Sequence, residues 1–169
     1  MMETMMRESS IKEQIEAFLF REAEYLDDRK WDEWLELFDP EAEYWIPSWD
    51  SEYEYTKNPN NEVSLMYYRD RSGLEDRIFR LRTGRSSASI PLPRTCHLVS
   101  NVRPTLNEDG TCSVRANFTS YVFRRNTTQN FFGYYEYLLI PQENDWRIKK
   151  KKIILINDYI DTVLDIYSV

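Results

Sequence analysis

The stretch TCSVRANFTSYVFRRNTTQNFFGYYEYLLI, residues 111–140, decides the fold. Residues 111–125 and 131–140 are rich in β-branched and aromatic side chains, which pack well on a pleated surface. Between them, residues 126–130 (NTTQN) are polar and typical of turns. The stretch therefore predicts two long antiparallel strands joined by a turn.

Segments on both sides of this stretch have the same texture, separated by turn-forming residues. The further predicted strands are 95–106 (TCHLVSNVRPTL), 146–157 (WRIKKKKIILIN) and the shorter 41–47 (EAEYWIP), which ends at Pro47. The predicted turns and loops are 48–61, 107–110 (NEDG) and 143–146 (ENDW).

Apolar side chains recur at helical spacing in three segments, all of which precede the long strands. The predicted helices cover 11–27, a short segment around Trp31, Trp34, Leu35 and Phe38, and 73–83 with Leu74, Ile78 and Leu81 on one face. Ser10 followed by Glu13 is a capping-box signal for the start of the first helix. Asp28 is the expected cap of the second helix, and Pro40 its expected end.

Helices followed by long antiparallel strands form an α+β pattern, and nothing in the chain marks an internal boundary. We therefore expect one domain over residues 1–169. A curved, mostly antiparallel sheet with the N-terminal helices packed in its concave face makes a cone. The element order suggests the cone-shaped fold of nuclear transport factor two, ketosteroid isomerase and scytalone dehydratase.

Composition limits the possible partners. The chain has 169 residues, 41% of them hydrophobic and 15% aromatic, with a formal charge of −7. A net negative surface repels nucleic acid and anionic lipid. No apolar run approaches the ~18 residues of a membrane span, and the N-terminus lacks the apolar core of a signal peptide. Cys96 and Cys112 show no framework spacing, so we expect reduced thiols in the cytoplasm.

The count of metal-binding side chains excludes several chemistries. The chain has one His and two Cys. A Rieske cluster needs two of each, and a facial iron triad needs two His and a carboxylate. A structural zinc needs four N or S ligands. Glycine-rich nucleotide motifs and a G-x-S-x-G elbow are absent from the sequence. We therefore expect no catalytic, cofactor-binding or metal-binding residue in this chain.

His97, the only histidine, has two interpretations. A histidine in an alternating strand is usually a hydrogen-bonded structural residue, and this interpretation is favoured. Alternatively, His97 could pair with a carboxylate such as Asp27 or Asp28 in the cone and transfer protons, as in a stand-alone isomerase or dehydratase.

Two patterns have the character of surfaces. Trp49, Tyr53, Tyr55, Met66, Tyr67 and Tyr68 are residue types enriched at interfaces, although ordinary partial burial fits equally well. Four consecutive lysines, Lys149 to Lys152, lie in a predicted strand whose alternation puts two on each face. One face must then meet water, an acidic neighbour or a bulge.

A dimerising binding module is a third functional alternative, beside the stand-alone enzyme and a subunit of a larger complex.

Four segments resemble the small (beta) subunits of aromatic-ring-hydroxylating dioxygenases. They are REAEYLDDRKWDEWLELF (21–38), AEYWIP (42–47), EVSLMYYRDRSGLEDRIFRLRTGRSSASIPLPRTCHLVSNV (62–102) and WRIKKKKIILINDYIDTVLDIYSV (146–169). Together they span nearly the whole chain. The third is similar to the benzoate and anthranilate dioxygenase branch.

The resemblance implies a cone fold and a structural role beside a large (alpha) subunit, commonly in a hexamer with three of each. It places the Rieske [2Fe-2S] cluster and the mononuclear Fe(II) in the alpha subunit, with electrons supplied from NADH by a separate reductase. The complex adds both atoms of O₂ to an aromatic ring. For subunit contact, the resemblance and the aromatic pattern together suggest Trp49, Tyr67, Tyr68, Arg94, His97 and Asn101.

Overall fold

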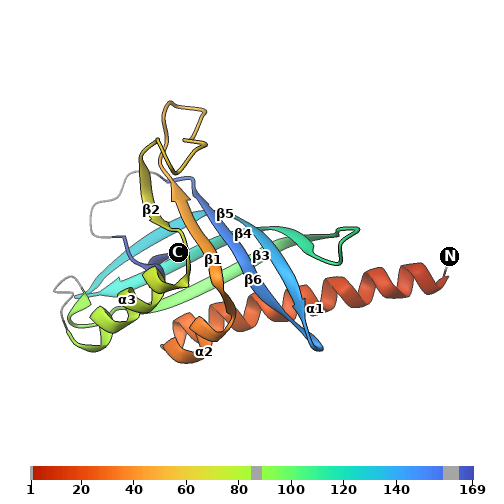
Figure 1. The fold of residues 1–169 in the computed structure, drawn as a ribbon. Coiled ribbons are helices and arrows are strands. Elements are labelled where there is room, and N and C mark those ends of the chain that lie inside the picture. Colours follow the sequence, from red (N-terminus) through yellow and green to blue (C-terminus); the bar gives the residue numbers. More distant parts are fainter. Residues whose placement is uncertain (1, 85–88, 158–163) are drawn as a thin grey trace.

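The computed structural model describes residues 2–84, 89–157 and 164–169, in which three helices pack against one face of a curved six-stranded sheet (Figure 1). The strands are β1 (Phe38–Pro47), β2 (Ser64–Tyr68), β3 (Arg94–Leu106), β4 (Cys112–Arg124), β5 (Thr127–Gln142) and β6 (Asp145–Leu155). Their order in the sheet is β2-β1-β6-β5-β4-β3. Only the β1–β6 pair is parallel among these neighbours, so the predicted α+β cone with a mostly antiparallel sheet is confirmed.

Strands β4 and β5 form a long antiparallel hairpin, as residues 111–140 predict, but the expected turn over residues 126–130 is wrong, since β5 already begins at Thr127 and Arg124 pairs with Thr127. Alternate β4 side chains are buried against the helices, from Cys112 to Val122, and those between them face outward. Where β5 meets β6, a Cβ on Gly133 would lie 1.8 Å from the carbonyl oxygen of Ile154. Glycine is therefore the residue that lets these two strands approach.

A β-bulge in β6 resolves the four-lysine run. Leu138 of β5 is opposite Lys150 and Leu139 is opposite Ile148, which leaves Lys149 as the extra residue. The sequence left three possibilities open for this run, namely water, an acidic neighbour or a bulge, and the structure shows a bulge. It turns Lys151 inward, where its side chain is 1% exposed.

Helix α1 (Met2–Asp27) ends where the sequence predicts but starts earlier. The capping box at Ser10 is wrong, because Ser10 lies inside the helix and accepts a hydrogen bond from Gln14 Nε2 (3.4 Å). The preceding segment is rich in Met, Glu and Arg, which favour helix and let it continue through Ser10.

Helix α2 (Trp31–Glu36) differs from its prediction at both ends. Lys30, not Asp28, occupies the cap position, and its side chain makes no capping hydrogen bond. Pro40 does not end the helix, since β1 has already begun at Phe38. Pro40 fits near the start of the strand because its missing N–H is tolerated where the ladder is incomplete; β1 and β6 lose register between Phe38 and Glu43.

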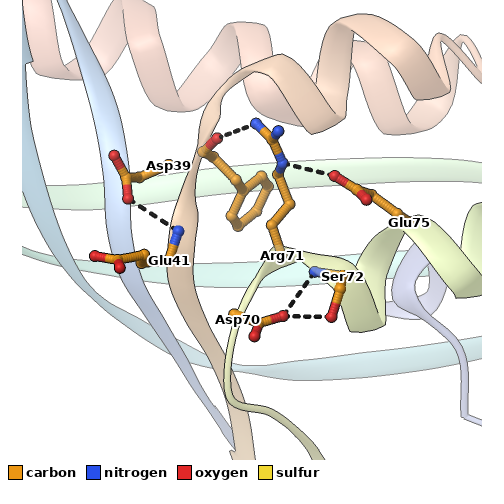
Figure 2. Close-up of polar contacts among 7 residues, drawn as sticks. Asp39, Glu41, Asp70, Arg71, Ser72 and Glu75 are labelled. Carbon is orange, nitrogen blue, oxygen red and sulfur yellow. Dashed lines mark hydrogen bonds and ion pairs between the residues drawn. The ribbon is translucent and has the colours of Figure 1, made fainter.

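Helix α3 (Arg71–Arg82) covers the sheet beside β1, and Leu74, Ile78 and Leu81 are buried as predicted. Asp70 caps it by accepting bonds from the backbone N–H and hydroxyl of Ser72 (Figure 2). Arg71 fixes the helix to the strand: Nη1 donates to the carbonyl of Phe38 (2.9 Å) and Nε donates to Glu75 (2.9 Å).

Two elements were not predicted from the sequence. Strand β2 pairs antiparallel with β1 at the edge of the sheet, with Tyr68 opposite Tyr44. A short 3-10 helix, η2 (Ile166–Ser168), is buried near the C-terminus. Asp165 caps it and is 0% exposed, and Arg77 of α3 donates to both of its carboxylate oxygens. This ion pair fixes the C-terminal residues against the helix layer.

Candidate functional site

The six side chains suggested for subunit contact lie at opposite edges of the sheet. Trp49, Tyr67 and Tyr68 belong to the β1–β2 edge, whereas Arg94, His97 and Asn101 belong to β3. The structure therefore does not gather them into one site. It gives two separate regions.

At the β1–β2 edge, the aromatic residues already have partners within the chain. The indole N–H of Trp49 donates to the carbonyl of Leu155 (2.7 Å), and the Tyr67 hydroxyl donates to Glu43 Oε2 (3.1 Å). The ring of Tyr68 packs against the core and lies 6.2 Å from that of Tyr44. Each side chain remains partly exposed, so part of each is available to another chain.

On β3, the suggested residues divide between the two faces of the sheet. Arg94 is exposed and its guanidinium lies 4.8 Å from the ring centroid of Phe123. Asn101 is exposed in a left-handed conformation (φ 54°), between Ser100 and Arg103 where the pairing with β4 shifts register. Asn tolerates this conformation better than most residues. His97 points the other way, into the fold.

His97 forms a pair with Asp27 at the end of α1. Its ring Nδ1 lies 2.6 Å from Asp27 Oδ1, and its backbone N–H donates to Oδ2 (2.9 Å). Thr95 donates its hydroxyl to the same carboxylate (2.8 Å). The structure thus selects Asp27 over Asp28 as the partner of His97. Three donors from β3 converge on one carboxylate and fix the helix end to the strand.

The electrostatics of this pair determine its proton positions. Burial alone would raise the pKa of Asp27, but hydrogen bonds and charge from His97, with Thr95, lower that pKa overall. An ionised carboxylate only accepts hydrogen bonds, so Nδ1 of His97 carries a proton. The other ring nitrogen, Nε2, is buried, and the His97 side chain is 1% exposed. The pair has the geometry of an acid–base pair, but His97 is closed off from solvent. This burial favours a structural role, in which the pair positions β3 against the end of α1.

A second buried cluster, missed by sequence reasoning, lies inside the cone. Glu22 of α1 accepts hydrogen bonds from Lys151 Nζ (2.6 Å), the Trp34 indole (3.1 Å) and the Tyr137 hydroxyl. The Lys151 ammonium also lies 4.5 Å from the ring centroid of Tyr135. Burial lowers the pKa of Lys151 while Glu22 opposes that shift. The sequence signal for this position is the run Lys149 to Lys152, because strand alternation turns two of four consecutive side chains toward each face.

The outer face of the sheet carries an apolar patch that the sequence prediction also missed. Its members are Leu98, Tyr121, Phe132 and Ile156, each at least 40% exposed. Thr119 lies opposite both Leu98 and Phe132, and Ile156 donates its backbone N–H to the carbonyl of Phe132 (2.8 Å). Beside Tyr121 lies a groove of about 380 Å³ bounded by Arg94, Cys96 and Phe123. Clustered exposed apolar side chains are typical of protein interaction sites.

The residues present do not fit an iron cofactor. One His cannot supply the two imidazoles of a Rieske centre or of a facial triad. Among the described residues, no group of three or more His, Cys, Asp or Glu side chains is arranged to bind a metal. Both cysteines are free thiols. Within the same residues, no helix is long and apolar enough to cross a membrane.

Comparison with known proteins finds one family over most of the chain. A family model described as "Ring hydroxylating beta subunit" matches residues 21–162. The benzoate 1,2-dioxygenase subunit beta of Acinetobacter baylyi is 43% identical over 93% of this chain and 93% of its own length. The anthranilate 1,2-dioxygenase small subunit of that organism is 41% identical over 92% and 95%.

A solved structure gives the same result in three dimensions. The crystal structure of the beta subunit of the benzoate 1,2-dioxygenase from Burkholderia mallei superposes with a TM-score of 0.77 at 38% identity. The match covers 92% of this chain and 95% of that one. The resemblance to the benzoate and anthranilate branch, first suggested by four sequence segments, is confirmed.

Proposed function

The chain belongs to the ring hydroxylating beta subunit family, and from this premise we propose how it works as the structural small subunit of an aromatic-ring dioxygenase. Residues 1–169 act as a single domain that holds a large alpha subunit in a defined position. The alpha subunit carries the Rieske [2Fe-2S] cluster and the mononuclear Fe(II). An NADH-dependent reductase supplies the electrons, and the complex adds O₂ to an aromatic acid of the benzoate or anthranilate type.

The contrast between the two faces of the sheet is the observation that carries this proposal. The inner face is closed by hydrogen-bonded pairs such as Glu22–Lys151, which leaves it little scope for catalysis. The outer face exposes Leu98, Tyr121 and Phe132 around Thr119, and clustered exposed apolar side chains are uncommon on proteins that have no partner. A surface of this kind suits a subunit whose role is assembly.

The two separated edge regions suit assembly into a ring. A closed ring needs two different surfaces on each copy, one for each neighbour. Trp49, Tyr67 and Tyr68 occupy one edge, and Arg94 and Asn101 the other. We assign these five to subunit contact and assign His97 to supporting β3 from inside. This arrangement supports a hexamer with three alpha and three beta subunits.

The same proposal predicts the cellular compartment of the protein and the kinds of partner that it does not bind. Free cysteines and a soluble multicomponent oxidoreductase fit the cytoplasm. A net charge of −7 disfavours nucleic acid and membrane surfaces as partners. The aromatic acid is selected mainly in the alpha subunit.

Coexpression with the large subunit encoded beside this chain tests the proposal. We expect a stable complex whose mass corresponds to three of each subunit, and whose iron and dioxygenase activity require the large subunit. The isolated chain should be colourless and inactive, including after addition of Fe²⁺. A chain that never associates with that large subunit, or that turns over an aromatic acid alone, contradicts the proposal.

The His97–Asp27 geometry keeps a second function, a cone-fold isomerase or dehydratase, open to test. His97→Gln removes the acid–base group while keeping a polar side chain. Under the structural-subunit proposal, the assembled complex of this variant keeps its turnover number per iron. A loss of turnover in a complex of unchanged mass and iron content would favour proton transfer by His97.

A further inference from the structure

A row of charged side chains crosses the outer face of the sheet. Arg103 of β3 lies opposite Arg115 of β4, Arg115 opposite Glu136 of β5, and Glu136 opposite Lys152 of β6. Directly opposed residues of antiparallel strands project to the same face, so these four side chains form one line. Glu136 lies 3.9 Å from Lys152, and the two offset each other. The positive charge of the two arginines remains.

The two arginines form an unusual pair in a chain of net negative charge. Like charges directly opposite one another destabilise a sheet. Neither guanidinium forms an ion pair within residues 2–84, 89–157 and 164–169, and both side chains are exposed. The guanidinium of Arg115 lies 4.0 Å from the ring centroid of Tyr134, which restrains it. A restrained guanidinium is ready to bind a carboxylate with two N–H groups.

A groove of about 430 Å³ contains this arginine pair. It is bounded by Arg103, Thr105, Ser113, Arg115 and Glu136, together with Val114 and Tyr137. Thr105 lies opposite Ser113, so two hydroxyl groups face the same side as the arginines. Glu136 at the far wall discourages an anion from binding there. The anion-binding end of the groove is therefore the end near the β3 edge.

The chain itself presents a complementary acidic segment in the turn that follows β1, whose base packs on β6, where the Lys152 ammonium lies 4.8 Å from the ring centroid of Tyr55. Asp50, Glu52 and Glu54 are exposed in the turn between β1 and β2. Backbone hydrogen bonds to the carbonyl of Glu54, from Asp50 (2.8 Å) and Ser51 (3.1 Å), close this turn. An isolated bridge between Trp49 and Tyr55 forms its base. The carboxylates thus stand on an ordered turn, which lowers the entropy cost of binding.

We propose that the Arg103–Arg115 groove binds the acidic turn 50–54 of a second copy of this chain. The inference rests on the proposed structural function and identifies which surfaces meet between neighbouring small subunits. An acidic turn after β1 and a basic groove on β3 and β4 form the unlike, complementary pair that a closed ring requires. Opposite charges also steer association and set the register of the contact.

Charge reversal tests this pairing in the full-length chain. Arg103→Glu with Arg115→Glu, or Glu52→Lys with Glu54→Lys, brings like charges together at the contact. Each double variant should weaken self-association by roughly 30-fold or more in sedimentation experiments. Combining all four substitutions in one chain should restore it, because every contact then pairs a lysine-bearing turn with a glutamate-bearing groove. Self-association of the unmodified chain should also weaken at high salt.

A matched control carries the same change in charge elsewhere. Lys30→Glu with Arg80→Glu alters two exposed cations away from the row and should leave self-association unchanged. Circular dichroism of every variant checks folding, and the restored pair excludes a general folding defect as the cause.

The outcomes separate this inference from the proposed function. A monomeric unmodified chain, unchanged self-association in the reversed variants, or no restoration overturns the pairing. Arginine variants that bind the large subunit less tightly but self-associate normally also overturn it, because the occupant is then the large subunit. Absence of any complex with the large subunit overturns the proposed function instead, whatever the charge-reversed variants do.

Discussion

The inner and outer faces of the sheet deal with polar and apolar groups in opposite ways. On the inner face, the carboxylate of Glu22 has three donors and Lys151 has one carboxylate partner, all within one chain. On the outer face, Arg103 and Arg115 lie side by side, and Leu98 and Phe132 are exposed. The charges of Glu22 and Lys151 inside the fold are paired within one chain, whereas the outside exposes side chains that another chain could contact.

The difference between the two faces predicts which property a substitution changes, the stability of the isolated chain or its assembly. Changes on the inner face should alter the free energy of unfolding of the isolated chain, because its partners are intramolecular. Changes on the outer face should alter assembly and leave the isolated chain nearly as stable as before. Measuring both quantities for each variant tests the distinction directly.

The Glu22–Lys151 pair should give the largest effect. Glu22→Gln leaves a buried ammonium without a compensating charge, and losing one partner of a buried pair costs about 3–5 kcal/mol. In a domain of this size, the thermal midpoint should fall by roughly 10 °C. Chemical denaturation of the isolated chain gives the free energy of unfolding.

Two variants sharpen that result. Glu22→Gln combined with Lys151→Met removes both charges and should recover most of the lost stability. Glu136→Gln breaks the exposed contact with Lys152 on the other face of β6 and should cost less than about 1 kcal/mol. Equal losses for Glu22→Gln and Glu136→Gln would show that the inner face is not the more tightly integrated one.

The outer apolar patch should give the next largest effect, on assembly. Truncating an interface anchor costs about 2 kcal/mol or more of binding free energy, so Tyr121→Ala or Phe132→Ala should weaken the complex roughly 30-fold. Their thermal midpoints as isolated chains should hardly change. Titration of labelled chain into the assembled complex measures the exchange.

Phe20→Ala on α1 is the matched control, since Phe20 is exposed to a similar extent on the helical side. It should leave assembly unaffected. If Phe20→Ala disrupts the complex and Phe132→Ala does not, then the helical side faces the partner.

The sequence predicts the architecture well where one physical signal dominates. The β-branched and aromatic side chains of residues 111–140 predict β4 and β5, and the spacing of Leu74, Ile78 and Leu81 predicts α3. Local capping signals fail where neighbours compete, as at Ser10, whose flanking residues favour helix on both sides. Strand β2 is hidden because its five residues lie at a sheet edge and show only partial burial.

Candidate sites are harder to predict because they depend on contacts distant in sequence. The aromatic pattern finds Trp49 and Tyr68 but cannot show that each has an intramolecular partner. The Arg103–Arg115 row depends on strand register, which a single-residue bulge changes. The Asp27–His97 pair was among the alternatives, because a lone histidine and a helix-terminal carboxylate limit the choices.

The smallest expected effect concerns Asp27, at the edge where the inner face meets β3. Its pKa is lower when folded than when unfolded, so its stabilising contribution is present above the unfolded value near 3.8 and is lost as pH falls through the folded value. Asp27→Asn should cost about 1 kcal/mol at pH 7, since the carboxylate is partly exposed. Below pH 4 this variant should lose less further stability than the unmodified chain. Denaturation at both pH values measures the difference, with the exposed neighbour Asp28→Asn as control. If Asp28→Asn and Asp27→Asn show the same pH dependence, the contact with His97 does not stabilise the fold, and the closed inner face ends before β3.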